Sequence, residues 1–377
     1  MKILHIHQDY PDNRKFPSTN AVKNLIDGVK KKDKEIEHFV LSINRTSNPF
    51  RISFKRFDDG LSVVYWLIPL PYIYYISIKF WAFILRNTIN MKEFDCIHAH
   101  KLTTEGVFAY LLSKSTSIPY YISVRGGTDM HNINRFSEIE KIFSKIYNNA
   151  KEIFWVSPWA IQFIVSRLGV NERGVSLPNI CELEEPKDII DKNRPRYVIV
   201  LSFHQYRRKG LMQLFKSIKE LNKNGFDIKL DVIGSGGENE KKLIQNEVIK
   251  LGLSRHVKLL GQLTHSEVLT KLQASKALLL PAENETFGMV YIEAISCGCP
   301  ILYMANTGVD GYFSDKNVGI KVHSREINEL CEAIIKLENS NSFYRREIQN
   351  LLKRGELEEF KEDSIVKSYI TEFADDR

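Results

Sequence analysis

The sequence has few cysteines, and none of them are arranged in a way that predicts a disulfide framework or a zinc site. The five cysteines among 377 residues are scattered and odd in number, and no CxxC pair occurs. Free thiols in a reducing compartment are the simplest interpretation. The chain also runs directly into a strand-like segment, residues 2–6, without a charged region and a small-residue cleavage site. We therefore expect no signal peptide and a cytoplasmic location.

Long uninterrupted apolar runs are missing as well. Residues 61–78 contain no charge and approach the roughly 20 residues of a membrane span, but Pro69 and Pro71 interrupt them. A strand, a proline turn and an aromatic helix over residues 72–87 fit this stretch better. The basic residues that flank it are Arg51, Lys55, Arg56, Lys79 and Arg86. This arrangement predicts peripheral contact with an anionic membrane, the cytoplasmic face of an inner membrane being the expected one. The alternative is that the aromatic side chains of residues 61–88 form core.

Two further absences exclude whole classes of protein. No GxGxxG follows the first strand-like run, which excludes a Rossmann dehydrogenase. The net charge of +7 permits a nucleic-acid partner, but no nucleic-acid-binding module is present, and we expect no such partner.

What the sequence does contain is a regular alternation of apolar strand-like runs and helical patterns from end to end. This alternation predicts an α/β fold with parallel sheets. The length is sufficient for two domains, each with its own core. The polar segment 182–196, ELEEPKDIIDKNRPR, carries two prolines and is the best candidate for the linker between them.

The most informative segment is KALLLPAENETFGMVYIEAISCGCPILY, residues 276–303. An apolar strand over residues 277–280 ends at Pro281, and a helix begins between residues 286 and 288. Gly298 is expected to end that helix, with Pro300 just beyond it. Ligands of open α/β sheets bind at the carboxyl ends of strands. The amides at the start of this helix therefore predict an anion site, as for a phosphate.

Two carboxylates bracket this junction. Glu285 precedes the helix, and Glu293 lies eight residues further on, about 12 Å along the helix axis. That separation is too large for a shared proton or a single metal ion, but it suits two hydroxyl-bearing parts of one long ligand. The alternative is that both are ordinary solvated glutamates. Against it, Glu293 stands in an apolar run, where an acid needs a partner.

The string E-TFGMVYI-E-A-x-x-C-G-x-P resembles the E-x7-E signature of the family-4 retaining glycosyltransferases of the GT-B fold (glycosyl transferases group 1), and Asn306-Thr307-Gly308-Val309 is similar to that family's pattern. The resemblance implies two Rossmann-like, doubly wound domains that face a central cleft. It implies an acceptor domain over residues 1–185, a linker over 186–196, a nucleotide-sugar domain over 197–355, and a C-terminal helix over 356–377 that packs back on the first domain.

The resemblance also assigns a donor site. Lys209, before Gly210, matches a lysine that contacts the donor phosphates, whereas Phe203 stands where the family has an arginine. Either Arg207 or Arg208 could substitute for it, or both could belong to an exposed loop. The other implied contacts are sugar hydroxyls for Glu285, the ribose for Glu293, the phosphates for the amides of Phe287, Gly288 and Met289, and the base for the turns at Gly234 and Leu263.

The first domain is expected to hold the acceptor. His100 ends one strand and is a candidate for acceptor contact, the alternative being a histidine that is hydrogen-bonded at a strand end. Arg125 stands in a segment that resembles the family's V-H-G-x-D, where histidine is commoner. An arginine keeps a hydrogen-bond donor there but cannot act as a base. Asp129 could cap the segment that follows.

These residues and the resemblance together predict a glycosyltransferase, and the resemblance implies that it is a retaining one. It would move a hexose or N-acetylhexosamine from a nucleotide-sugar, with UDP favoured over GDP, to a saccharide acceptor, expected to be lipid-linked, in bacterial surface polysaccharide biosynthesis. No cofactor or metal is expected, because the nucleotide-sugar is a substrate and no aspartate pair lies near a donor loop. The alternative is a non-catalytic GT-B partner subunit, which the departures at Phe203 and Arg125 keep open.

Overall fold

Apolar strands that are buried on both faces form a mainly parallel sheet in each of two units. The computed structural model describes residues 1–14, 19–183 and 194–374. The first unit joins residues 1–180 to the C-terminal segment that begins at Phe360, and the second comprises residues 181–359. Most of the predicted linker, residues 186–193, lies outside the described residues.

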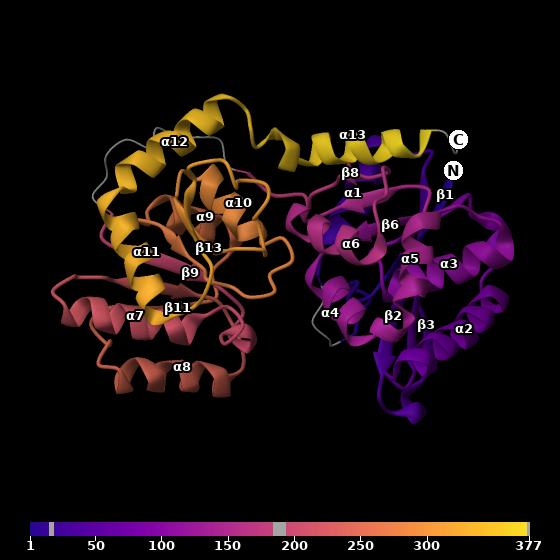
Figure 1. Cartoon of the computed structure of the whole chain (residues 1–377), viewed down its shortest axis with the longest axis horizontal. Helices are drawn as coiled ribbons and strands as arrows, with labels where there is room; N and C mark the ends of the chain where they lie inside the picture. The colour runs from indigo at the N-terminus through magenta and orange to yellow at the C-terminus, as the bar shows by residue number, and fades with distance from the viewer. Residues whose placement is uncertain (15–18, 184–193, 375–377) are drawn as a thin grey trace. The chain divides into compact units, whose positions relative to one another are not determined.

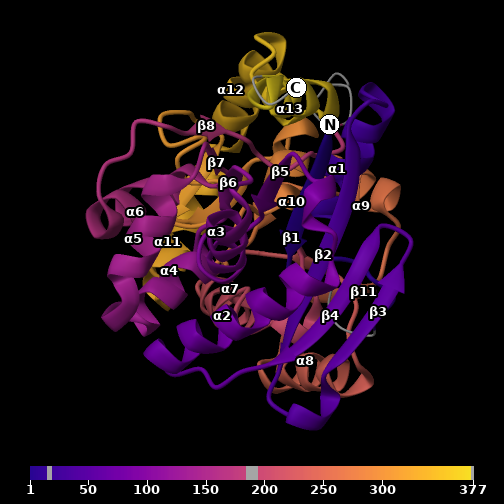
Figure 2. The same ribbon diagram turned by 90° about the vertical axis from the view of Figure 1, so that its right-hand side faces the viewer.

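The first unit contains an eight-stranded sheet of order β3-β4-β2-β1-β5-β6-β7-β8. All of its neighbouring strands pair in parallel except β3, which pairs antiparallel with β4. Figure 2 shows the four strands β1 to β4 side by side at this end of the sheet. The strands are β1 (Lys2–His7), β2 (Glu37–Thr46), β3 (Ser53–Phe57), β4 (Gly60–Trp66), β5 (Cys96–Ala99), β6 (Tyr120–Val124), β7 (Ile153–Trp155) and β8 (Val175–Ser176).

Helices cover both faces of this sheet. One face packs its alternate strand residues against α1 and the C-terminal helix α13, which lie beside each other in Figure 1. The opposite face forms the larger core with α2, α3, α5 and α6. The helices of the unit are α1 (Ala21–Lys32), α2 (Pro71–Thr88), α3 (Thr104–Thr116), α4 (Gly127–Arg135), α5 (Glu140–Asn149), α6 (Ile161–Leu168) and α13 (Glu362–Glu372).

The second unit contains a parallel six-stranded sheet of order β11-β10-β9-β12-β13-β14. Its strands are β9 (Tyr197–Val200), β10 (Leu230–Ile233), β11 (Val257–Gly261), β12 (Leu278–Leu279), β13 (Ile301–Met304) and β14 (Gly319–Val322). Its helices are α7 (Leu211–Lys223), α8 (Glu238–Lys250), α9 (His265–Gln273), α10 (Met289–Ser296), α11 (Ile327–Asn339) and α12 (Asn341–Lys353). The predicted α/β class with two parallel sheets is thereby confirmed.

The aromatic segment 61–88 is partly core and partly surface. Helix α2 buries Trp81, whose indole Nε1 donates a hydrogen bond to the backbone oxygen of Trp66 (2.8 Å). Its opposite side leaves Phe80 and Phe83 about 60% exposed, at 59% and 63%. Sequence reasoning missed β3, because its five residues, SFKRF, place two basic residues side by side and lack the alternation that indicates a strand.

Two other expectations concern the chain as a whole. The cysteines carry free thiols, four of them buried and Cys331 partly so. Within the residues that the structure describes, none of the helices combines the length and the apolar character that crossing a membrane requires.

Candidate active site

The sheet of the second unit reverses its strand order between β9 and β12, which are neighbours although they are far apart in the sequence. At such a point the two following loops diverge, and ligands of open α/β sheets bind at the carboxyl ends there. The loop after β9 contains residues 201–210, and the loop after β12 contains residues 281–288. The topology therefore brings the predicted phosphate loop and the predicted glutamate loop together.

Lys209 and Glu285 meet at this point in an ion pair between the Lys209 ammonium and Glu285 Oε2, and both side chains are only 11–13% exposed. Arg208 lies 3.5 Å from the same carboxylate oxygen and donates hydrogen bonds to the backbone oxygens of Glu283 (3.2 Å) and Asn284 (2.9 Å). Two cations thus stand beside the predicted sugar-binding carboxylate, where a diphosphate could be stabilised.

The structure separates the two arginines that could replace the missing family arginine. Arg207 donates from Nε to the hydroxyl of Tyr206 (2.9 Å) and stacks over that ring, away from Glu285. Arg208 faces Glu285. Phe203 itself is 2% exposed and packs beneath the glycine turn after β10, so it is a core residue. Arg208 is therefore the better-placed cation.

The loop that carries Glu285 is held by Thr307, a residue that the sequence reading left without a role. The Thr307 hydroxyl accepts from the Glu285 amide (2.6 Å) and donates to the Glu285 carbonyl (2.8 Å), and the Gly308 amide donates to the same carbonyl (2.8 Å). No spacing rule indicates such a pairing, because Thr307 lies 22 residues further along the chain. Only the resemblance of the 306–309 segment to the family pattern pointed to it.

Helix α10 begins where the sequence placed it, with Gly288 as its N-cap at φ 72°. A β-carbon at Gly288 would lie 2.6 Å from the ring of Tyr291, whose hydroxyl donates to the Leu280 oxygen (2.6 Å). The side chain of Phe287 is buried, and Met289 is partly buried. The first amides of a helix cannot bond within it, so the close packing at Gly288 brings backbone donors to the loop.

Glu293 lies further along α10, and its side chain is largely buried. Burial raises the pKa of its carboxyl, the nearby His265 lowers it, and the carboxylate of Glu182 adds to the rise. Within the described residues the Glu293 carboxylate makes no hydrogen bond, whereas His265 pairs with Glu182 (3.2 Å). The protein therefore keeps an acid in a poorly solvated place, as a site for a ligand hydroxyl would.

The two predicted base-contacting turns follow strands of the same sheet. Gly234 ends β10 and donates its amide to the Gly261 oxygen (2.8 Å), and a β-carbon there would lie 1.8 Å from the Leu201 oxygen. Leu263 is partly buried between β11 and α9. Both positions lie near carboxyl ends of the sheet, but the structure assigns neither a ligand contact.

The predicted acceptor residues lie in the first unit and are tied into its interior. The side chain of His100 has no exposed surface, and its Nε2 lies 3.0 Å from His5 Nδ1. Arg125 donates to the His100 oxygen (3.0 Å) and to Asn179 Oδ1 (2.9 Å), and burial lowers its pKa to about 10. These contacts match the alternative interpretation of His100, as a hydrogen-bonded histidine at a strand end.

Asp129 joins two strand ends. Its carboxylate accepts from the Thr103 amide (3.0 Å) and the Arg125 amide (3.3 Å), and burial raises its pKa to about 6. It therefore caps the segment before α3, and not the helix in which it lies. Nearby, the buried Glu105 accepts from the Gln8 amide (3.0 Å) and lies 3.5 Å from the ammonium of Lys101. Sequence reasoning missed Glu105, which looks like an ordinary helix glutamate.

Solved structures with the same architecture identify the fold of this protein. Sucrose-phosphate synthase from Thermosynechococcus elongatus superposes with a TM-score of 0.74 at 16% identity, covering 99% of this chain and 98% of that one. HepE of Anabaena, in complex with UDP and glucose, superposes with a TM-score of 0.67 at 16% identity, covering 98% of both chains. The fold is GT-B, as predicted.

Sequence comparisons show similarity to glycosyltransferases. Residues 184–354 match the family model described as glycosyl transferases group 1. An uncharacterized glycosyltransferase of Methanocaldococcus jannaschii is 28% identical over 68% of both chains. The gpi3 subunit of the phosphatidylinositol N-acetylglucosaminyltransferase of Schizosaccharomyces pombe is 23% identical over 78% of this chain and 64% of its own length. Residues 184–354 are therefore similar to the glycosyl transferases group 1, and the prediction of a glycosyltransferase is confirmed.

Proposed function

We propose that this protein is a family-4 retaining glycosyltransferase that moves a hexose or N-acetylhexosamine from a UDP-sugar to a lipid-linked saccharide in bacterial surface polysaccharide biosynthesis. The observation that carries the proposal is the pairing of Lys209 with Glu285 at the point where the sheet reverses its strand order. A cation for the leaving diphosphate and an acid for sugar hydroxyls then stand side by side. The HepE structure, which holds UDP and glucose, supports a UDP donor in this fold.

In the proposed reaction the acceptor oxygen bonds to the anomeric carbon on the face that the diphosphate leaves. The bond from that carbon to the phosphate oxygen breaks, and its electron pair stays on the diphosphate. The acceptor proton passes to a phosphate oxygen. Lys209 and Arg208 stabilise the developing negative charge, and the α10 amides of Gly288 and Met289 add backbone donors. Glu285 is held by Lys209, which suits a positioning role better than attack on carbon.

A lipid-linked acceptor is supported by one surface of the first unit. We define the α2 surface as the large side chains, each at least 39% exposed, of α2, the loop before it and the β2–β3 segment: Phe50, Ile52, Phe54, Ile68, Leu70, Tyr72, Ile73, Ile76, Phe80 and Phe83. Exposed basic residues, Arg51, Lys55, Arg56, Lys79 and Arg86, accompany them. Apolar anchors with a basic border fit an anionic membrane face. The S. pombe relative is named for a transferase of a phosphatidylinositol, which agrees with such an acceptor.

A non-catalytic partner subunit is the alternative. Phe203 favours it, because the family arginine is absent and a buried core residue occupies its position. The intact ion pair of Lys209 and Glu285 counts against it.

Thermal-shift measurements with UDP-, GDP- and ADP-sugars test the proposal, because a ligand that binds the native state raises its stability. We expect the UDP-sugars to give the largest rise in Tm, and slow release of UDP when the protein is incubated with the best donor. A rise in Tm without any UDP release, with or without saccharide acceptors, would support the partner subunit. If no nucleotide-sugar raises Tm, the proposed donor site is wrong.

A further inference from the structure

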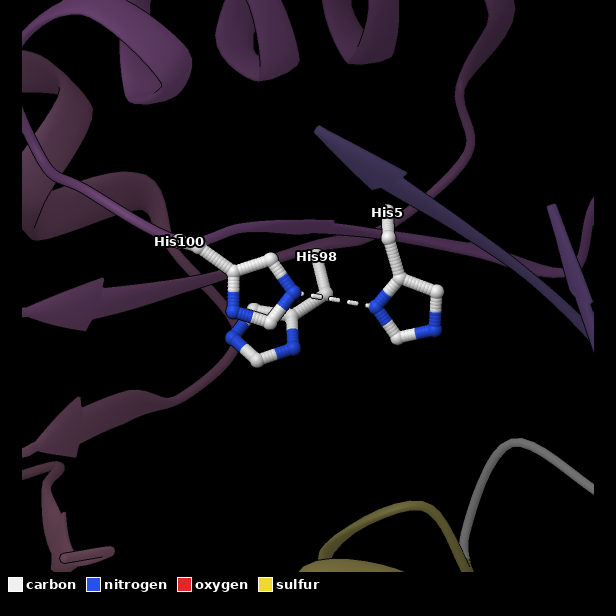
Figure 3. Close-up of side chains that lie close together, drawn as sticks. All are labelled: His5, His98 and His100. Carbon is white, nitrogen blue, oxygen red and sulfur yellow. Dashed lines mark hydrogen bonds between the residues drawn. The ribbon is translucent and has the colours of Figure 1, made fainter. Parts of the chain in front are cut away.

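Three histidines lie together in the core of the first unit, on the sheet face that α1 and α13 cover. His5 is on β1 and His98 is its direct neighbour on β5. His100 follows two residues after His98, so its side chain leaves the same face. Figure 3 shows the ring of His5 beside those of His98 and His100, with a dashed line from His5 to His100. None of the three side chains has any exposed surface.

The ring nitrogens are spaced as metal ligands are. One nitrogen from each ring lies within 4.8 Å of one nitrogen from each of the other two. His5 Nδ1 and His100 Nε2 are 3.0 Å apart, close to the roughly 3.3 Å between two donors of a tetrahedral zinc ion. The rings of His98 and His100 are also close, with centroids 3.9 Å apart.

Each of two candidate ligands has the outer partner that a metal-bound imidazole needs. His5 Nε2 lies 2.9 Å from His38 Nδ1, and His98 Nε2 lies 2.9 Å from Ser123 Oγ. Such partners fix the tautomer and the orientation of a ligating ring. The other nitrogen of His98, Nδ1, lies 2.8 Å from the hydroxyl of Tyr369 on α13, which places an oxygen donor beside the three rings.

The donor set selects one class of ion. Imidazole suits Zn²⁺, Co²⁺, Ni²⁺ and Cu²⁺, whereas Mg²⁺ and Ca²⁺ prefer carboxylate, carbonyl and water oxygens. Burying a cluster of imidazoles costs free energy of desolvation, and metal binding would offset that cost.

We propose that His5, His98 and His100 bind one zinc-class divalent ion, with the oxygen of Tyr369, which releases its proton to solvent on binding, as the fourth donor. The site is structural, because all of its donors are buried and come from the protein. It joins strands β1 and β5 to α13 and so fastens the C-terminal helix to the sheet of the first unit. The proposal does not depend on the donor site, whose residues all belong to the second unit.

The test uses the full chain, unfolded in denaturant with a chelator, freed of both, and refolded with or without one equivalent of Zn²⁺ or Co²⁺. We expect one ion per chain, a higher Tm with Zn²⁺, and the strong visible absorption of tetrahedral Co²⁺. His5→Gln and His100→Gln should each weaken Co²⁺ binding at least about tenfold, and Tyr369→Phe by about tenfold. His131→Gln, at an exposed histidine of the same unit, is the matched control and should bind as the unchanged chain does.

The Co²⁺ absorption spectrum of the unchanged chain tests the proposal even if a variant does not fold. If the refolded full chain binds no stoichiometric ion, or if its Co²⁺ spectrum is octahedral, the proposal fails. It fails equally if folded His5→Gln and His100→Gln bind Co²⁺ as tightly as His131→Gln does.

Discussion

At the scale of single residues, the proposed donor site depends on the ion pair between one lysine and one glutamate. Lys209 and Glu285 are both largely buried, and Thr307 fixes the loop on the glutamate side. A charged group that the protein already orients needs little free energy of reorganisation to stabilise a new anion. Preorganised sites lower activation barriers in this way. When a diphosphate arrives, Lys209 can share its donors between the phosphate and Glu285 without leaving the loop.

Lys209→Ala should therefore lower kcat/KM by about 10²–10³, the usual effect of removing one preorganised donor. Arg208→Ala should cost less, because Arg208 lies further from Glu285. Arg207→Ala is the matched control, since its guanidinium stacks on Tyr206 and lies outside the pair. Steady-state kinetics with the best donor measure all three. An Arg207→Ala loss as large as that of Lys209→Ala would contradict this assignment of roles.

Glu293 shows a different design, because its carboxylate makes no hydrogen bond within the part of the chain that the structure describes. Because burial raises its folded pKa above the unfolded value, the protonated form stabilises the fold at low pH, and this contribution is lost as pH rises through the folded pKa. Glu293→Gln cannot ionise, so it should raise Tm at neutral pH and lose that advantage as pH falls below the usual glutamate range. The same change should weaken UDP binding by about tenfold if the carboxylate accepts ribose hydroxyls.

Thermal denaturation across pH, with and without UDP, measures both effects. Glu285→Gln is the contrasting variant: it strands the Lys209 ammonium, and its Tm should fall at neutral pH. A Glu293→Gln protein that is less stable than the unchanged chain at neutral pH would show that the carboxylate has a stabilising partner.

At the scale of elements, sequence reasoning succeeded where a local pattern decides the outcome. The strand, turn and helix around residues 277–296 follow from apolar spacing, Pro281 and Gly298, and Gly298 does take a left-handed φ of 68°. Sequence reasoning fell short where a contact between residues far apart in the sequence decides the local structure. Nothing near Phe203 in the sequence shows that a glycine turn some 30 residues away packs on it, and the pairing of Glu285 with Thr307 is equally invisible.

Helix α2 is a case in which two interpretations of one segment both hold in part. Apolar residues recur at helical spacing on both sides of α2, so the composition could not show which side is core and which is surface. The structure does, because Trp81 and Leu85 are buried while Phe80 and Phe83 are exposed. The exposed side is the one that a membrane could contact.

Replacing Phe80 and Phe83 with serine should therefore release the protein from anionic vesicles without lowering Tm, because neither side chain is core. Vesicle co-sedimentation measures the binding. Neutral vesicles should bind the unchanged protein more weakly, because the basic residues beside the exposed apolar side chains then have no anionic headgroups to contact. Trp81→Ser is the matched contrast and should mainly destabilise the fold, since the indole is buried and hydrogen-bonded. An unchanged protein that never binds anionic vesicles would rule out the membrane contact.

At the scale of the whole molecule, the chain leaves its first unit and returns to it at the end. Helix α13 completes the core over one sheet face with Ile365, Val366, Tyr369 and Phe373. Gly28 of α1 lets the two helices approach, since a β-carbon there would lie 2.8 Å from Val366 Cγ2. The ion pairs of Lys31 with Glu362 (3.0 Å) and Lys32 with Asp363 (3.1 Å) are exposed and contribute little. The first unit is thus discontinuous, and its stability depends on apolar packing of distant sequence.

Val366→Ala combined with Phe373→Ala should destabilise the first unit by several kcal/mol, because each change leaves a cavity and a buried Phe→Ala alone costs about 3–5 kcal/mol. Hydrogen exchange read by strand separates the two units: amides of β1 and β5 should lose protection, while those of β9 and β10 keep theirs. Lys367→Ala, at an exposed position of the same helix, should leave both sets unchanged. Equal loss of protection in both units would mean that they unfold as one cooperative body, whereas undisturbed β1 and β5 amides would mean that α13 adds no stability to the sheet it covers.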